Sequence, residues 1–209
     1  MCRDGPQRVC AAGLRLSRRR RPGRAASGKS GQWPSCKVDF PKPIVAAVGG
    51  PCMGSGMEML LATDIRIASP NARFGVPEVR RGLFPGGGAA LKLPRQIPQT
   101  HAMDMLLTGR TIGPDEALAI GLIGMVVEPE ELLEEAIKKA ELIAANSPVA
   151  VQSSKLCALE GMRLSLEEAY AAEKIHVDRV FGGPDAREGP RAFMEKRLPQ
   201  WASPQATEF

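Results

Sequence analysis

Two glutamates, and the glycine-rich loop that precedes one of them, have the residue types and spacing that acid–base chemistry requires. Glu58 stands in an otherwise apolar run directly after the loop of GGPCMGSGMEMLLATDIRI, residues 49–67. Glu78 follows in FGVPEVRRG, between a short extended segment and a second glycine-rich loop. Two carboxylates that meet beside a polarised carbonyl group could add or remove water or move protons. The alternative is a pair of solvated or ion-paired surface glutamates, with Arg80 and Arg81 as available partners for Glu78.

The loop around Ser55 lacks the signatures of three well-known functional loops. A dinucleotide-binding loop requires a third glycine where Met59 stands, and a phosphate-binding P-loop requires a lysine that this loop lacks. A nucleophile elbow requires glycines two residues before and after the serine, where Met53 and Met57 stand. The pattern that remains is a strand, a loop and a helix start, whose first backbone N–H groups could bind a developing oxyanion. Alternatively, the glycines only allow the strand and the helix to pack closely.

Strands and helices alternate on both sides of this loop, and further helices follow them. The apolar run PIVAAV predicts a buried strand before the loop, and MEMLLAT predicts a short helix that starts near Gly56. Further strands are expected at DIRIAS, ARFG and GMVVE, and helices at residues 87–98, 102–109 and 114–122. A 3.6-residue apolar period in residues 130–148, and a capping box at Ser165 and Glu168, predict helices in the last third. This order predicts an α/β core with a C-terminal helical subdomain.

Residues 1–40 differ in composition from the rest of the chain. They hold ten of the 28 lysines and arginines and only two acidic residues, and they are rich in arginine, glycine, proline and serine. A segment without a sustained apolar period cannot offset its ordering entropy, so we expect it to be disordered. Three explanations stay open: a transit-peptide-like leader, a basic arm that contacts nucleic acid or membrane, or sequence from a wrongly placed start or a broken gene.

Cysteine usage and hydropathy exclude several classes of protein. Three of the five cysteines lie in residues 1–40, and none forms a CxxC pair. A zinc site or a disulfide framework is therefore not expected, and a reducing compartment fits this usage. No apolar run of the sequence approaches the roughly 18 residues of a membrane span. Cys52 and the methionines around it are expected to line the core or a pocket.

A long segment of the chain resembles the crotonase superfamily, the enoyl-CoA hydratases and isomerases. The likeness starts with KPIVAAVGGPCMGSGMEMLLATDIRIASPNARFGVPEVRRGLFPGGGAALKLPR at Lys42 and continues through LLTGRTIGPDEALAIGLIGMVV to AREGPRAFMEKR. It implies an α/β fold with a spiral core of ββα repeats, here N-terminally truncated, and a C-terminal helical subdomain. The implied domains are a leader at 1–40 that is unlike the family, the core at 41–128, and a helical subdomain at 129–209 for oligomerisation and CoA contact.

The resemblance also implies roles for individual residues. Glu58 would orient and deprotonate the water that attacks C3 of an enoyl thioester, and Glu78 would deliver a proton to C2. The backbone N–H of Ser55 would be one donor to the thioester oxyanion. The neighbouring substrate-binding residues would be Gly54, Gly56 and Pro77.

The expected partners follow from the same resemblance. Phe193 and Lys196 would reach the CoA of an adjacent subunit in a homotrimer or hexamer. The substrate would be an acyl-CoA thioester, with no metal, no other cofactor, no nucleic acid and no membrane. The expected location is the cytoplasm, or mitochondria if the arginine-rich leader is a transit peptide.

Several alternatives stay open at this point. Retention of both glutamates favours hydration, but isomerisation or another crotonase reaction is the first alternative. Family members carry about a third of their fold ahead of K-P-x-x-A-A, including an A-G-x-D loop that supplies the second oxyanion donor, and residues 1–40 show no such motif and no strand pattern. The second alternative is therefore an inactive, truncated protein that serves in interactions. A serine peptidase of the Clp type, with Ser55 as nucleophile, is disfavoured because His101 and His176 lie outside the positions it needs.

Overall fold

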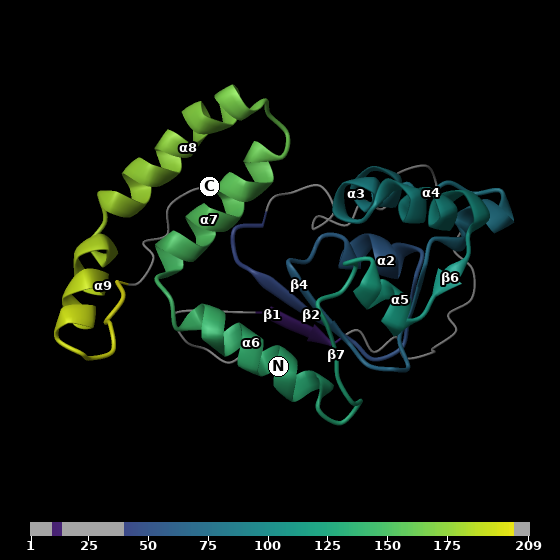
Figure 1. Ribbon diagram of the computed structural model, residues 1–209, viewed down its shortest axis with the longest axis horizontal. Helices are drawn as coiled ribbons and strands as arrows, with labels where there is room; N and C mark the ends of the chain where they lie inside the picture. The colour runs from purple at the N-terminus through teal and green to yellow at the C-terminus, as the bar shows by residue number, and fades with distance from the viewer. Residues whose placement is uncertain (1–9, 14–39, 203–209) are drawn as a thin grey trace, which may run out of the picture. The chain divides into compact units, whose positions relative to one another are not determined.

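The computed structural model describes residues 10–13 and 40–202. These residues divide into two compact units, shown in Figure 1. Residues 11–13 and 44–137 form the α/β unit, and residue 10 with residues 40–43 and 138–202 forms the helical unit. The division falls within one helix, α6 (Leu132–Ala144).

A four-stranded sheet runs through the α/β unit in the order β1-β2-β4-β7. Its strands are β1 (Cys10–Gly13), β2 (Ile44–Val48), β4 (Ile65–Ala68) and β7 (Met125–Val126). β2, β4 and β7 are parallel, and Val45 lies opposite Ile65. Val45 and Ile67 are fully buried, as expected for apolar strands covered on both faces.

A smaller sheet carries the glycine-rich loop, and its first strand follows β2 in the chain. Its strands are β3 (Pro51–Met53), β5 (Arg73–Gly75) and β6 (Thr111–Ile112). β3 pairs with β5 in parallel, and β5 pairs with β6 in antiparallel register. Phe74 in the middle of β5 is fully buried, which anchors this sheet in the core. The sequence alone predicts neither β3 nor β6, because both are too short to show an alternating pattern.

Five short helical segments cover the sheets of the α/β unit. They are α2 (Ser55–Leu60), the 3-10 helix η1 (Pro77–Arg81), α3 (Ala89–Gln96), α4 (Gln99–Thr108) and α5 (Pro114–Ala119). α4 packs against α3 and η1, and α5 packs against β7 and β5. Met57, Leu93 and Met105 are fully buried and join these helices into one core. Gly109 ends α4 in a left-handed conformation, as the sequence predicts.

The helical unit continues α6 with three further helices. They are α7 (Pro148–Gly161), α8 (Leu166–Phe181) and α9 (Asp185–Met194). α7 and α8 pack against each other as a helical hairpin. The predicted capping box at the start of α8 is present: Ser165 Oγ accepts from Glu168 N at 3.3 Å, and Ser165 N donates to Glu168 Oε2 at 2.9 Å. Among the described helices, none has the length and apolar character that crossing a membrane requires.

The structure differs from the sequence-based expectation within residues 1–40. Disorder was expected throughout this segment, yet Cys10–Gly13 form strand β1 at the edge of the larger sheet. Pairing with β2 satisfies backbone donors and acceptors that an open sheet edge would leave to solvent. Four small residues are too few to show a strand pattern in the sequence. The rest of that prediction concerns residues 1–9 and 14–39, which lie outside the described residues.

Candidate active site

The loop before α2 is held in a conformation that favours glycine. Gly54 has φ +56° and ψ −122°, a region that residues with a side chain rarely enter. The Gly54 N–H donates to Gly75 O of β5 at 3.1 Å, and the Gly54 carbonyl accepts from Glu58 N at 3.0 Å. The loop is thus fastened to the small sheet on one side and to α2 on the other. Ser55, the first residue of α2, is exposed, and first-turn amides of a helix have no acceptor within it.

Glu58 is a buried carboxylate held by the second glycine-rich loop. It is only 7% exposed, although its neighbours on α2 are the apolar Met57 and Met59. The Gly87 N–H donates to Glu58 Oε1 at 2.5 Å. A Cβ atom on Gly87 would lie 2.2 Å from Glu58 Oε2, so the glycine leaves the space that the carboxylate occupies. The geometry fixes the Glu58 carboxylate between α2 and the start of α3.

Glu78 projects toward the first glycine-rich loop from the first turn of η1. Its Oε1 lies 3.2 Å from the position that a Cβ atom of Gly54 would take. Its Oε2 is buried and has no hydrogen-bond partner among the described residues. The ion pairs considered for a surface glutamate do not form, since Arg80 Nε donates to Thr108 O at 2.9 Å and an Arg81 guanidinium N–H lies 3.5 Å from Pro77 O.

The predicted site residues fall into two groups. The six that surround the first loop all lie in the α/β unit, on β3–α2 and on η1: Gly54, Ser55, Gly56, Glu58, Pro77 and Glu78. The two predicted CoA contacts, Phe193 and Lys196, lie at the end of α9 in the helical unit. The structure therefore brings both carboxylates to the same loop.

Gly87 is a site residue that the sequence reasoning missed. Its backbone N–H donates to the Glu58 carboxylate. The signal was present in the run of glycines at 86–88, which a packed loop without a ligand or a close approach rarely needs. The sequence could not show which side chain approaches that run, because Glu58 and Gly87 lie 29 residues apart.

Cys52 is a structural thiol, as expected. Burial raises the pKa of Cys52 to about 11, and the nearby Arg66 charge opposes that rise only in part. Burial also lowers the pKa of Arg66 to about 10, with Asp64 opposing the shift. The Arg66 guanidinium donates to the Leu122 carbonyl at 3.1 Å and to the Thr63 carbonyl at 3.0 Å. A thiol that stays protonated cannot serve as a nucleophile.

The two histidines lie in different units of the structure. His101 lies on α4, and His176 lies on α8 of the helical unit with Nε2 3.5 Å from Glu160 Oε2. Groups of three or more His, Cys, Asp or Glu that could hold a metal ion are absent from residues 10–13 and 40–202. The chemistry that the arrangement offers is that of two carboxylates beside a loop of backbone amides.

Fold and site together define a crotonase-type α/β protein with two glutamates at a glycine-rich loop. The family model described as enoyl-CoA hydratase/isomerase matches residues 9–204, and the chain belongs to this family. The match begins one residue before β1, within the segment where the sequence alone shows no family motif. The resemblance to the crotonase superfamily and the fold class are confirmed.

Individual relatives agree with this assignment. The chain is 42% identical over 182 residues to an enoyl-CoA hydratase of Mycobacterium tuberculosis. The matched segment covers 84% of this chain and 68% of that protein. It is 42% identical over 162 residues to crotonyl-CoA hydratase of Syntrophomonas wolfei, which covers 78% of this chain and 62% of that protein. The crystal structure of an enoyl-CoA hydratase from M. tuberculosis superposes with a TM-score of 0.78 at 39% identity, covering 80% of this chain and 67% of the other.

These comparisons support the predicted type of enzyme, one of the enoyl-CoA hydratase/isomerase family. The chain spans from 60 to 68% of the length of these and other curated relatives.

Proposed function

We propose that this protein adds water across the 2,3 double bond of a trans-2-enoyl-CoA thioester. One observation carries the proposal: two carboxylates reach the same glycine-rich loop, one held by a backbone amide and the other with a buried oxygen that no described residue bonds. A buried carboxyl oxygen without a protein partner costs about 1–3 kcal/mol, so it fits a group whose hydrogen bond falls to water or substrate. The names of the relatives, enoyl-CoA hydratase and crotonyl-CoA hydratase, support the same reaction.

The two glutamates divide the proton transfers between them. The carboxylate of Glu58, fixed by Gly87 N–H, takes a proton from water as the water oxygen bonds to C3. The electron pair of the double bond moves toward the thioester carbonyl, and the Ser55 N–H donates to the oxyanion that forms. Glu78 in its acid form then gives a proton to C2. The product is a 3-hydroxyacyl-CoA, and no cofactor besides the CoA of the substrate takes part.

Glycine at the loop positions lets the substrate approach the backbone. Gly54 and Gly56 flank Ser55, and a side chain on Gly54 would lie against the Glu78 carboxylate. Pro77 precedes Glu78 at the first turn of η1, where a proline fixes the backbone angle. We infer that these three residues line the place of the thioester.

A hydration assay with a short trans-2-enoyl-CoA tests the proposal. Loss of the conjugated double bond is followed by ultraviolet absorbance for the wild type and for Glu78→Gln and Glu58→Gln. Each variant should lower kcat by about 10²–10⁴-fold, the usual contribution of one acid–base group. Glu130→Gln, an exposed glutamate of the same unit, is the matched control and should keep wild-type activity. Equal rates for the wild type and both site variants would rule out hydration by this chain and favour the inactive, interaction-only alternative.

The same variants separate hydration from isomerisation. Isomerisation moves the double bond from C3–C4 to C2–C3 and requires one base that carries a proton from C2 to C4. Hydration requires a second group that activates water. With a 3-enoyl-CoA as substrate, an isomerase would keep its activity in Glu58→Gln. A wild type that hydrates the 2-enoyl-CoA faster than it isomerises the 3-enoyl-CoA, with hydration lost in Glu58→Gln, supports hydration as the main reaction.

The helical unit supports a further part of the proposal, a homotrimer or hexamer in which α9 contacts the CoA of an adjacent subunit. Four exposed apolar side chains, each 42 to 75% exposed, share one face of α8: Leu166, Tyr170, Val177 and Phe181. An exposed apolar face of this kind is typical of a protein–protein contact. The side chain of Phe193 is 84% exposed, and Lys196 is exposed beside it.

We place the reaction in a reducing compartment, the cytoplasm, with mitochondria as the alternative. Cys52 and Cys157 are free thiols, which fits such a compartment. Cell fractionation of the tagged full chain distinguishes the two locations.

A further inference from the structure

A lysine occupies the left-handed position after α9, where helices usually have glycine. Lys196 has φ +51° and is the only described non-glycine residue with a positive φ. Its N–H donates to Phe193 O at 3.2 Å, and the next N–H, of Arg197, donates to Ala192 O at 3.0 Å. These two hydrogen bonds are the Schellman motif, in which the left-handed residue is usually glycine because a side chain strains that conformation.

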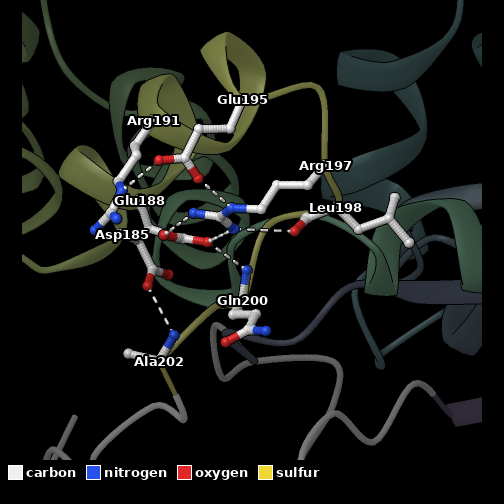
Figure 2. Close-up of polar contacts among 8 residues, drawn as sticks. All are labelled: Asp185, Glu188, Arg191, Glu195, Arg197, Leu198, Gln200 and Ala202. Carbon is white, nitrogen blue, oxygen red and sulfur yellow. Dashed lines mark hydrogen bonds and ion pairs between the residues drawn. The ribbon is translucent and has the colours of Figure 1, made fainter.

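Arg197, the residue after Lys196, is braced by two carboxylates. Its two terminal guanidinium nitrogens donate to the two oxygens of Glu188 at 2.6 and 3.1 Å, and its Nε donates to Glu195 Oε2 at 2.6 Å. Figure 2 shows the guanidinium group between these two glutamates, with Arg191 on the far side of Glu195. Bidentate, charge-assisted hydrogen bonds of this kind fix geometry as well as charge. Residues on both sides of Lys196 are thereby held.

The segment that follows Arg197 is fastened back to the beginning of α9. Glu188 Oε1 also accepts from Gln200 N at 2.7 Å, and Asp185 Oδ1 accepts from Ala202 N at 2.8 Å (Figure 2). Asp185 is buried, and its Oδ2 accepts from Ser147 Oγ at 2.6 Å. The chain therefore cannot relax the Lys196 backbone without breaking several of these bonds.

The ion pair of Glu188 and Arg197 stays charged at neutral pH. The hydrogen bonds from Arg197 and from Gln200 N lower the pKa of Glu188 to about 2. The same glutamates raise the pKa of Arg197 above its ordinary value. The side chains at the turn itself are, in contrast, directed to solvent, since Phe193 and Met194 are both more than 80% exposed.

We propose that Arg197, held by Glu188, is a positioning residue for CoA: it keeps Lys196 in the left-handed conformation that presents the ammonium group to the CoA phosphates beside the Phe193 ring. The inference rests on the proposed function, which supplies CoA as the ligand. A lysine where glycine would be less strained points to a requirement for its side chain. Arg197 itself does not contact CoA and acts only through Lys196.

Two thioesters that differ only in the nucleotide test this role. The enoyl-CoA substrate carries the phosphates that Lys196 would bind, whereas the corresponding enoyl-pantetheine thioester lacks them. Arg197→Gln should raise KM for enoyl-CoA about tenfold, the size expected for one hydrogen bond to a charged group. The KM for the pantetheine thioester and kcat for both substrates should stay unchanged. Lys174→Gln is the control, because it removes a comparable exposed ion pair, Lys174 Nζ to Asp178 Oδ2 at 2.7 Å, on α8.

A double-mutant cycle separates positioning from a general structural effect. Lys196→Gly should raise KM for enoyl-CoA as Arg197→Gln does, and the double variant should be no worse than Lys196→Gly alone. Additive effects, or an equal rise of KM for both thioesters, would overturn the positioning role. If Arg197→Gln fails to fold, Glu188→Gln, which keeps the arginine and the two Schellman bonds, is expected to give a smaller rise for enoyl-CoA only, and no rise would overturn the role.

Binding of free CoA keeps this inference distinct from the proposed reaction. Calorimetric titration with CoA requires no turnover, and Arg197→Gln should weaken the wild-type affinity about tenfold. CoA binding that depends on Arg197 without any hydration would refute the proposed reaction and leave the inference standing. Hydration with equal KM for the two thioesters would refute the inference and leave the reaction standing.

Discussion

Gly54 combines two roles that a larger residue could not fill together. Its positive φ turns the chain from β3 into α2, and its missing side chain leaves room for the Glu78 carboxylate 3.2 Å from the Cβ position. The same backbone carries Ser55, the expected oxyanion donor. The backbone conformation of the loop and the placement of Glu78 therefore both depend on one residue.

Gly54→Ala is expected to reduce both stability and activity. A side chain forced into φ +56° and ψ −122°, a region that essentially only glycine adopts, costs on the order of 1–3 kcal/mol, and displacement of Glu78 should lower kcat on the order of 10²-fold. Thermal unfolding and the hydration assay measure the two effects. Gly121→Ala is the matched control, because Gly121 also has a positive φ, +75°, but a Cβ there would meet nothing within 4 Å. The control should also lose stability, because its positive φ strains a side chain, and it should keep its activity; equal losses of activity would show that strain alone is responsible.

The candidate carboxylates could be predicted from the sequence because each stands beside a glycine-rich segment in a recognisable motif. Glu58 was visible as a charged residue in an apolar run, and Glu78 as part of F-G-x-P-E. The contact between Glu58 and Gly87, and the left-handed Lys196, could not be predicted. Both depend on how distant segments pack or on neighbours that fix a strained backbone, and no local pattern reports either.

Structural elements could be predicted from the sequence where they depend only on residues close together in the chain. The capping box of α8 needs only Ser165 and Glu168 and was predicted correctly. The strands β1, β3 and β6 are two to four residues long and exist because neighbouring strands offer hydrogen bonds, so the sequence did not show them. Pro94 lies inside α3, in its second half, where a proline ordinarily ends a helix.

Ser165→Ala is expected to destabilise the helical unit without affecting the chemistry. Removal of the N-cap hydroxyl leaves a first-turn amide of α8 without its acceptor, which costs about 1 kcal/mol. Thermal unfolding followed by circular dichroism should show a lower Tm, while kcat for hydration stays at the wild-type value. Ser154→Ala, an exposed serine within α7, is the control and should not lower Tm. An unchanged Tm in Ser165→Ala would mean that α8 is held by its packing on α7 alone.

The hydrogen bonds of Glu188 with Arg197 and with Gln200 N are expected to lose their contribution to stability in acid. Since the folded-state pKa of Glu188 is lowered from 4.5 to about 2, its stabilising effect is complete above pH 4.5 and falls as the pH drops toward 2. The Tm difference between the wild type and Glu188→Gln should therefore be largest at neutral pH and smaller at pH 3. Glu130→Gln, measured in parallel, corrects for the loss of one negative charge. A Tm difference that grows in acid would contradict this role of Glu188.

The whole molecule joins an α/β unit that carries the candidate acid–base site to a helical unit that carries the candidate CoA contact. The family match across residues 9–204 includes both units, so both belong to the design that the relatives share. The apolar face of α8, formed by Leu166, Tyr170, Val177 and Phe181, is exposed in the single chain. These residues recur at spacings of four and seven, which places them on one side of the helix.

A charged residue introduced on the apolar face of α8 tests whether this face forms the contact between subunits. Tyr170→Glu puts a carboxylate in the middle of the apolar face of α8, and burying it between subunits would leave a charge without a partner. Light scattering coupled to size-exclusion chromatography should show a trimer or hexamer for the wild type and smaller species for this variant. Ala171→Glu adds the same charge one residue later, on a different side of α8, and should leave the assembly intact. If CoA is bound across subunits, Tyr170→Glu should also raise KM for enoyl-CoA more than KM for enoyl-pantetheine. An oligomer that persists in Tyr170→Glu would show that α8 does not form the subunit contact.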